Sequence, residues 1–107
     1  MGTLMKSLVF ACAALAATLP SAHAAEPSGE AMAATCAGCH GTQGRLGTVE
    51  FVPLAGLSED EFVRAMRDFK SGKRPSTLMS VVANGFTESE IRSMARYFAG
   101  VKPSPAQ

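Results

Sequence analysis

The sequence of 107 residues has no tryptophan, one tyrosine, two histidines and three cysteines. It has no marked excess of either charge, with ten Lys and Arg against nine Asp and Glu. The basic excess of a nucleic-acid-binding protein is therefore missing, and that class is disfavoured. No apolar run approaches the roughly 20 residues needed to span a membrane. We accordingly expect no nucleic-acid partner and no transmembrane segment in the mature chain.

The first 24 residues have the pattern of a secretory signal. Lys6 is their only charged residue, residues 8–19 are apolar, and Ala22-His23-Ala24 fits the small-x-small cleavage pattern. Cleavage after Ala24 would leave one domain over residues 25–107. This mature chain is formally neutral and keeps one histidine and two of the three cysteines. The pattern predicts a periplasmic protein.

The mature sequence predicts an all-α fold of about four helices. The first is expected over residues 28–39, with Ser28 as its N-cap. Capping boxes predict helix starts at Ser58 and Thr87, and glycines predict ends near residues 72 and 100. A shorter helix is expected over residues 77–83. No stretch of the mature chain predicts a strand.

A glycine-rich segment, residues 41–56, separates the first two predicted helices. A structureless stretch of sixteen residues in a small domain is usually functional. A chain of this length buries a modest fraction of its surface, and a cofactor often supplies what the core lacks. The sequence therefore predicts a small helical fold wrapped around a cofactor.

The segment Cys36-Ala37-Gly38-Cys39-His40 is the strongest motif in the chain. Thiols at positions i and i+3 share one face of a helical turn, and a histidine directly after them is typical of covalent c-type haem attachment. The motif predicts one haem c, bound through thioethers of Cys36 and Cys39, with His40 as an iron ligand.

Three other interpretations of this motif are weaker. A structural zinc site needs four protein ligands, and this group supplies three. A thioredoxin-like redox pair needs a βαβ context, which the sequence does not predict. A disulfide would close only a four-residue loop and would add little stability.

The second axial ligand of the iron cannot be a histidine of the mature chain, because none remains. Four methionines are candidates. Met32 lies one turn before Cys36, and Met66 and Met94 lie on apolar helix stripes, which favours core packing for both. Met79 follows a loop that could fold over a flat ligand. The sequence favours Met79, with another methionine or an open site as the alternatives.

These residues resemble the class I c-type cytochromes over residues 31–99, and most closely the cytochrome subunit of flavocytochrome c sulfide dehydrogenase. Three stretches carry the resemblance: AATCAGCHG at 33–41, FKSGKRPSTLM at 69–79, and residues 85–99. The resemblance implies that Met79 is the second axial ligand and that the carbonyl of Pro53 accepts the Nδ1 proton of His40. It also implies that the first and last helices cross, with Met32 and Tyr97 near the crossing.

Five basic residues lie within eleven positions before the candidate ligand. They are Arg64, Arg67, Lys70, Lys73 and Arg74. Such a cluster could meet an acidic partner or a haem propionate, although a solvated helix face is the commoner role, above all for the first two. Arg74 lies nearest the ligand loop and is the candidate for the propionate.

The predicted function is electron transfer rather than catalysis. Two axial ligands leave the iron no vacant position, and the resemblance implies a flavoprotein partner that oxidises sulfide. Two alternatives stay open. One is a free-standing cytochrome that serves a terminal oxidase or reductase, and the other is a five-coordinate haem enzyme or gas sensor, which the lack of a second histidine disfavours.

Overall fold

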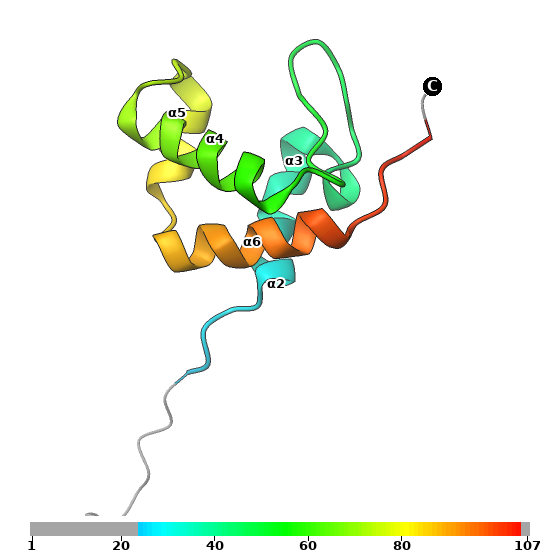
Figure 1. Ribbon diagram of the computed structural model, residues 1–107, viewed down its shortest axis with the longest axis horizontal. Helices are drawn as coiled ribbons and strands as arrows, with labels where there is room; N and C mark the ends of the chain where they lie inside the picture. Colours follow the sequence, from blue (N-terminus) through cyan, green and yellow to red (C-terminus); the bar gives the residue numbers. More distant parts are fainter. Residues whose placement is uncertain (1–23, 106–107) are drawn as a thin grey trace, which may run out of the picture.

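The computed structural model describes residues 24–105, and these residues form helices and no strand. The predicted all-α class is confirmed (Figure 1). The predicted secretory signal lies outside the described residues, apart from Ala24. The described part contains no helix that is both long and apolar enough to cross a membrane. The helical elements in chain order are α2 (Gly29–Ala33), η2 (Ala34–Cys36), α3 (Ala37–His40), η3 (Thr42–Gly44), α4 (Glu59–Ser71), α5 (Thr77–Asn84) and α6 (Glu88–Gly100).

The two longest helices begin at the predicted capping boxes. At α4 the Ser58 hydroxyl accepts from the amide of Glu61, whose carboxylate accepts from the Ser58 amide. Thr87 and Glu90 make the same reciprocal pair at α6. Gly72 ends α4 in the left-handed conformation, with φ at 78°, where a residue with a Cβ would be strained. Both helices therefore start and stop where local chemistry predicts.

The first predicted helix is the exception, because it is divided into three short pieces. Ser28 caps α2 as expected, but a single 3-10 turn, η2, separates α2 from α3. The backbone stays right-handed throughout, so the chain remains coiled up to Gly41, where φ turns to 75°. Residues 31–37 are mostly alanine, so low helix propensity does not explain the tighter turn.

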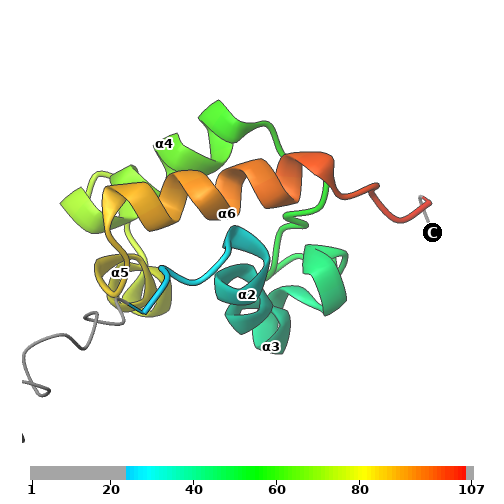
Figure 2. The ribbon, with the colours of Figure 1, turned by 90° about the horizontal axis from the view of Figure 1, so that it is seen from below.

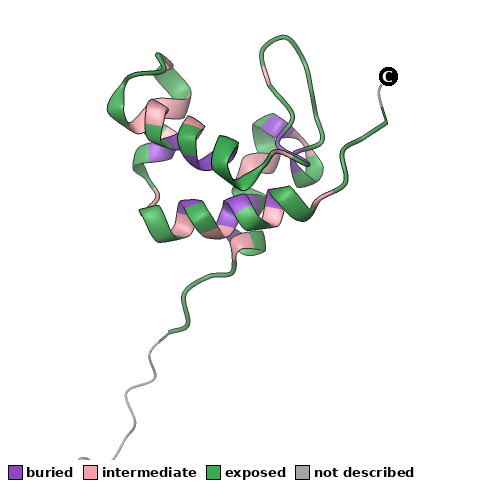
Figure 3. Cartoon of the chain, in the orientation of Figure 1, coloured by how far each residue is buried: buried purple, intermediate pink, exposed green. Residues whose placement is uncertain are grey.

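The core lies where α2, α4 and α6 face one another, as the purple segments of Figure 3 show. Ile91, Met94 and Phe98 on α6 are the largest fully buried side chains. Phe62 on α4 meets Phe98, with ring centroids 5.4 Å apart. The predicted apolar stripes of both helices therefore point inward and pack on each other.

The first and last helices cross, as the resemblance implied. Figure 2 shows α2 lying across α6. Met32 is buried in the same cluster as Met94 and Phe98, and Tyr97 is half-buried against that cluster. At the crossing Gly29 approaches α6 so closely that a Cβ there would overlap the backbone carbonyl of Ser93. The two ends of the domain are thus held together backbone to backbone.

Replacing Gly29 with alanine is expected to destabilise the domain, because the added methyl must push α2 away from α6. Overpacking of this kind costs about 1–3 kcal/mol. Urea unfolding of the purified protein, followed by far-ultraviolet circular dichroism, measures the change. The matched control is Gly100→Ala at the end of α6, where a Cβ meets nothing within 4 Å. The control should keep or slightly raise the stability, and equal stability of the two variants would refute the close crossing.

The segment 41–56 is irregular apart from the η3 turn, as predicted. Its backbone is nevertheless fixed: the amides of Leu54 and Ala55 both donate to the Gly44 carbonyl, at 2.8 and 3.0 Å. The Gly56 amide donates to the carbonyl of Phe98 on α6, at 2.9 Å. These hydrogen bonds hold the segment 41–56 against the core and place its middle part near His40.

Candidate functional site

The predicted attachment residues lie together on the coiled segment that ends at His40. Cys36 ends η2 and is half-buried, while Cys39 in α3 is exposed, and both thiols are free. His40 is only 8% exposed and is the one buried charged or polar residue among the described residues. The structure thus places a buried imidazole beside two thiols.

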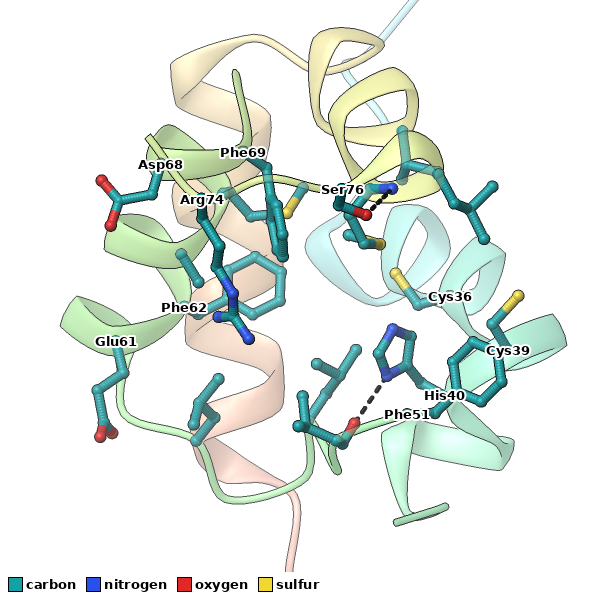
Figure 4. Close-up of a pocket in the computed structure, with 18 of the residues that line it drawn as sticks. Cys36, Cys39, His40, Phe51, Glu61, Phe62, Asp68, Phe69, Arg74 and Ser76 are labelled. Carbon is teal, nitrogen blue, oxygen red and sulfur yellow. Dashed lines mark hydrogen bonds between the residues drawn. The ribbon is translucent and has the colours of Figure 1, made fainter. Parts of the chain in front are cut away.

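The ring of His40 is held by two residues of the segment 41–56. Its Nδ1 donates to the backbone carbonyl of Val52 at 2.7 Å, drawn as the dashed line from His40 in Figure 4. The ring of Phe51 meets the imidazole edge-on, with centroids 5.9 Å apart and planes at 82°. Because Nδ1 is used in this bond, Nε2 is left free as the donor atom for a metal.

The predicted acceptor of this bond was wrong by one residue. The resemblance implied the carbonyl of Pro53, whereas the structure gives that of Val52. The Val52 carbonyl belongs to the peptide bond that precedes the proline, and the residue before a proline is held extended. Successive carbonyls of an extended chain point in opposite directions, so only one of the two can face His40. Pro53 still lines the site.

A cavity of about 780 Å³ opens in front of His40. This volume lies within the range of about 300–1,000 Å³ that is typical of small-molecule and cofactor sites. Its walls come from the attachment segment, the segment 41–56, α4 and α5 (Figure 4). Its lining residues include Cys36, Cys39, His40, Phe51, Val52, Pro53, Leu54, Phe62, Met66, Phe69, Arg74, Leu78, Met79 and Val82, together with the charged residues Glu50, Glu61, Arg64 and Asp68. The mostly apolar lining and the converging Cys, His and Met side chains fit a large flat apolar ligand that carries a metal.

Two of the four candidate methionines line this cavity. Met66 is buried in the core as well as lining the cavity, whereas Met79 on α5 is half-buried. The Met79 amide donates to the Ser76 hydroxyl at 3.0 Å, which fixes the first turn of α5. Met32 and Met94 belong to the core cluster and are not among the cavity's lining residues. Of the four candidate methionines, Met66 and Met79 are therefore the two that line the cavity.

Two of the five clustered cations line the cavity. The guanidinium of Arg74 lies over the ring of Phe69, 4.8 Å from its centroid, and Figure 4 shows it reaching into the cavity. Arg64 is the other. A guanidinium held on an aromatic ring suits an anionic group on a bound ligand. The position of Arg74 is thus compatible with its predicted role.

The remaining three cations have partners within the protein. Arg67 forms an ion pair with Glu88, which lowers the pKa of that carboxyl and joins α4 to α6. Lys70 donates to the Phe86 carbonyl, and Lys73 lies 3.7 Å from Asp68. Arg67, expected on a solvated face, is half-exposed but paired.

Two ionisable groups of the cavity have shifted pKa values. Burial raises the pKa of the Cys36 thiol, and the nearby Cys39 adds to the effect. The hydroxyl and backbone amide of Ser58 lower the pKa of the Glu61 carboxyl, because both bonds favour its charged form. Among the described residues no three His, Cys, Asp or Glu side chains form a group that could hold a metal ion.

Phe51 and the Val52 carbonyl were missed by the sequence analysis. Phe51 is the sole aromatic residue of the segment 41–56, and that segment was already predicted to be functional. A single aromatic residue in a glycine-rich segment is a signal that could have identified it. No such signal exists for the Val52 carbonyl. Every residue has a backbone carbonyl, so the residue type does not show which one will bind His40.

No family model matches the chain. Among curated proteins, it is 42% identical over 77 residues to the cytochrome subunit of sulfide dehydrogenase from Chlorobaculum tepidum, covering 71% of this chain and 68% of that one. It is 36% identical over 85 residues to cytochrome c4 of Pseudomonas aeruginosa, covering 78% of this chain and 42% of the relative. It is 33% identical over 97 residues to a thiosulfate dehydrogenase electron acceptor of Thiomonas intermedia, covering 90% of this chain and 45% of the relative. The chain thus spans less than half the length of the last two relatives.

Proposed function

The chain belongs to the class I c-type cytochromes, and from that premise we propose that it is a periplasmic electron carrier with one His/Met-ligated haem. One observation carries the proposal. Cys36, Cys39 and His40 line the same cavity as Met79, although Met79 lies 39 positions after His40 in the sequence. Relatives named as cytochromes c imply covalently bound haem c, and the cavity has the size and the donor set to hold it.

Each residue of the site has a definite role in this proposal. The thiols of Cys36 and Cys39 would hold the group as thioethers. Nε2 of His40 would bind the iron, kept in orientation by the Val52 carbonyl 2.7 Å from Nδ1. The Met79 sulfur would bind the iron from the α5 side, and Arg74 would bind a propionate carboxylate.

The ligand set favours electron transfer over catalysis. When bound, the haem supplies an iron that changes between ferrous and ferric states, and neutral thioether ligation raises its potential. With His40 and Met79 both used as ligands, the protein keeps no open position for a substrate. The cavity also offers no second histidine to act as an acid or base, because His40 is the sole histidine of the described residues.

The proposed electron donor is a sulfide-oxidising flavoprotein subunit. The support is the identity of 42% with a protein named as the cytochrome subunit of sulfide dehydrogenase. Thiosulfate oxidation has support from the 33% identity with a thiosulfate dehydrogenase electron acceptor, over a smaller share of that relative. A free-standing carrier that serves a terminal oxidase or reductase is the remaining alternative.

Mixing the oxidised protein with a sulfide dehydrogenase flavoprotein and sulfide tests the donor. We expect the protein to be reduced at least about tenfold faster than with sulfide alone, as its visible spectrum would show. The reason is that the flavoprotein would take electrons from sulfide and pass them to this protein. The control replaces sulfide with thiosulfate and a thiosulfate dehydrogenase. Faster reduction in the control would favour thiosulfate oxidation, and equally slow reduction in both would favour the free-standing carrier.

A further inference from the structure

The segment that carries Met79 has little apolar packing of its own. This segment, residues 73–86, contains α5, and Ala83 is its one buried residue. On α5, Leu78 is 51% exposed and Val81 is 72% exposed. A helix of eight residues is too short to be stable in water by itself. The position of this segment, which we call the α5 segment, therefore depends on contacts with the rest of the protein.

Three consecutive residues at the end of α4 contact both ends of the α5 segment. Figure 1 shows α4 beside α5. At the start of the segment, the Arg74 amide donates to the Asp68 carbonyl at 3.0 Å, and the Arg74 guanidinium lies over the ring of Phe69. At the other end, Nζ of Lys70 donates to the carbonyl of Phe86. The last turn of α4 therefore holds the segment on both sides of α5.

The two ends of the α5 segment are held by bonds of different kinds. The bond to α4 at the start joins two backbone groups, so it does not depend on the side chains. At the far end, the bond from Lys70 to Phe86 is the one hydrogen bond, among the described residues, that joins residues 80–86 to another part of the chain. A hydrogen bond from a charged donor is stronger than one between neutral groups. The polar attachment of the far end thus depends on a single side chain.

Lys70 also differs from the other members of the basic cluster in its surroundings. It is half-buried, whereas Arg64, Arg67, Lys73 and Arg74 are exposed. An ammonium group that is partly removed from water costs free energy unless it gains a bonding partner. The backbone carbonyl at the end of the α5 segment supplies that partner. The burial and the bond together indicate that Lys70 acts within the protein rather than on an external group.

We propose that Lys70 is a positioning residue for Met79, because its bond to Phe86 keeps the α5 segment closed over the cavity. The inference rests on the proposed function, in which the Met79 sulfur binds the iron. Leu78, Met79 and Val82 line the cavity from α5, so movement of this helix withdraws all three. Without the Lys70 bond the far end of the segment detaches more often, while α4 and α6 stay packed on each other. The α5 segment then opens as a local unit, without unfolding of the whole domain.

Replacing Lys70 with methionine tests this role, because methionine keeps an unbranched apolar stem and lacks the ammonium. Nuclear magnetic resonance of the reduced protein measures amide hydrogen exchange in each helix. We expect the α5 amides to exchange at least about tenfold faster and the α6 amides to change less than about twofold. A tenfold change corresponds to about 1.4 kcal/mol, near the lower end of what a hydrogen bond to a charged group contributes. Added imidazole can bind the ferric protein only after Met79 has left the iron, so it should bind faster by a similar factor.

Two further variants separate the Lys70 bond from a general effect of charge. Lys70→Arg keeps a charged donor and should restore both rates to within about threefold of the wild type. Lys73→Met removes the same charge from an exposed lysine 3.7 Å from Asp68 and should change both rates less than about twofold.

The outcomes distinguish this role of Lys70 from the proposed function. Wild-type α5 exchange in Lys70→Met would overturn the proposal, and so would faster α5 exchange with unchanged imidazole binding. If the wild type shows the near-infrared methionine band, either result refutes the role of Lys70 alone. A wild type without that band would refute the His/Met ligation itself, and the positioning of Met79 with it.

Discussion

Replacing both Cys36 and Cys39 with serine is expected to abolish covalent haem attachment completely. Serine keeps the size of the side chain but lacks the thiol that forms the thioether. The cavity of about 780 Å³ would then be empty in most molecules, and an apolar cavity that large is strongly destabilising. Mass spectrometry of the exported protein should show the bare polypeptide, and haem staining of a denaturing gel should show no band.

The third cysteine provides the matched control for this experiment. Cys12 lies in the predicted secretory signal, outside the described residues, so Cys12→Ser should give protein with a full haem load. The single variants Cys36→Ser and Cys39→Ser should each keep at most one thioether. The attachment proposal would fail if the wild-type protein, correctly exported, carried only free thiols or a disulfide.

Replacing Met79 with alanine is expected to open the iron to external ligands. The near-infrared band that reports methionine sulfur bound to ferric haem should disappear, and the reduced protein should bind carbon monoxide. The reduction potential should also fall, because a neutral thioether favours the ferrous state. Absorption spectroscopy of the purified protein, with and without carbon monoxide, measures both changes.

Met66→Leu is the decisive comparison, because Met66 is the other methionine that lines the cavity. Leucine nearly conserves its volume, so the loss of stability should stay below about 1.5 kcal/mol. The near-infrared band should persist in this variant. If the band were lost with Met66→Leu and kept with Met79→Ala, the ligand assignment would have to be reversed. Carbon monoxide binding by the wild type as readily as by Met79→Ala would indicate an open site.

Local chemistry made much of the helical framework predictable. The capping pairs at Ser58 and Thr87, and the left-handed end at Gly72, depend on residues within one or two turns of each other. Short stretches of sequence are enough to predict such interactions. The predicted starts of both long helices are confirmed for that reason.

Features that depend on residues far apart in the chain could not be predicted in the same way. The overlap that excludes a side chain at Gly29 involves Ser93, more than sixty residues later. The choice of Val52 over Pro53 depends on which of two neighbouring carbonyls faces His40 across the fold. The partners of Arg67 and Lys70 lie on or just before α6. A sequence gives the type of each group in these cases, but only the fold gives its partner.

The sequence predicted a cofactor cavity, but not all of the residues that line it. The haem motif identified Cys36, Cys39 and His40 because their spacing is local. Core packing was the favoured role for Met66, and the structure shows that it also lines the cavity. A side chain on the boundary between core and cavity satisfies both patterns, so helical periodicity cannot separate them.

The crossing of α2 and α6 has a consequence for the maturation of the chain. On the proposed periplasmic route, the chain would leave the cytoplasm amino end first, and the thiols of Cys36 and Cys39 would emerge well before Gly100. Until α6 has emerged, α2 has no surface to pack against, because its closest contact is the backbone of α6 at Ser93. During this interval α2 has therefore not yet packed on α6, and both thiols stay accessible for the proposed haem attachment.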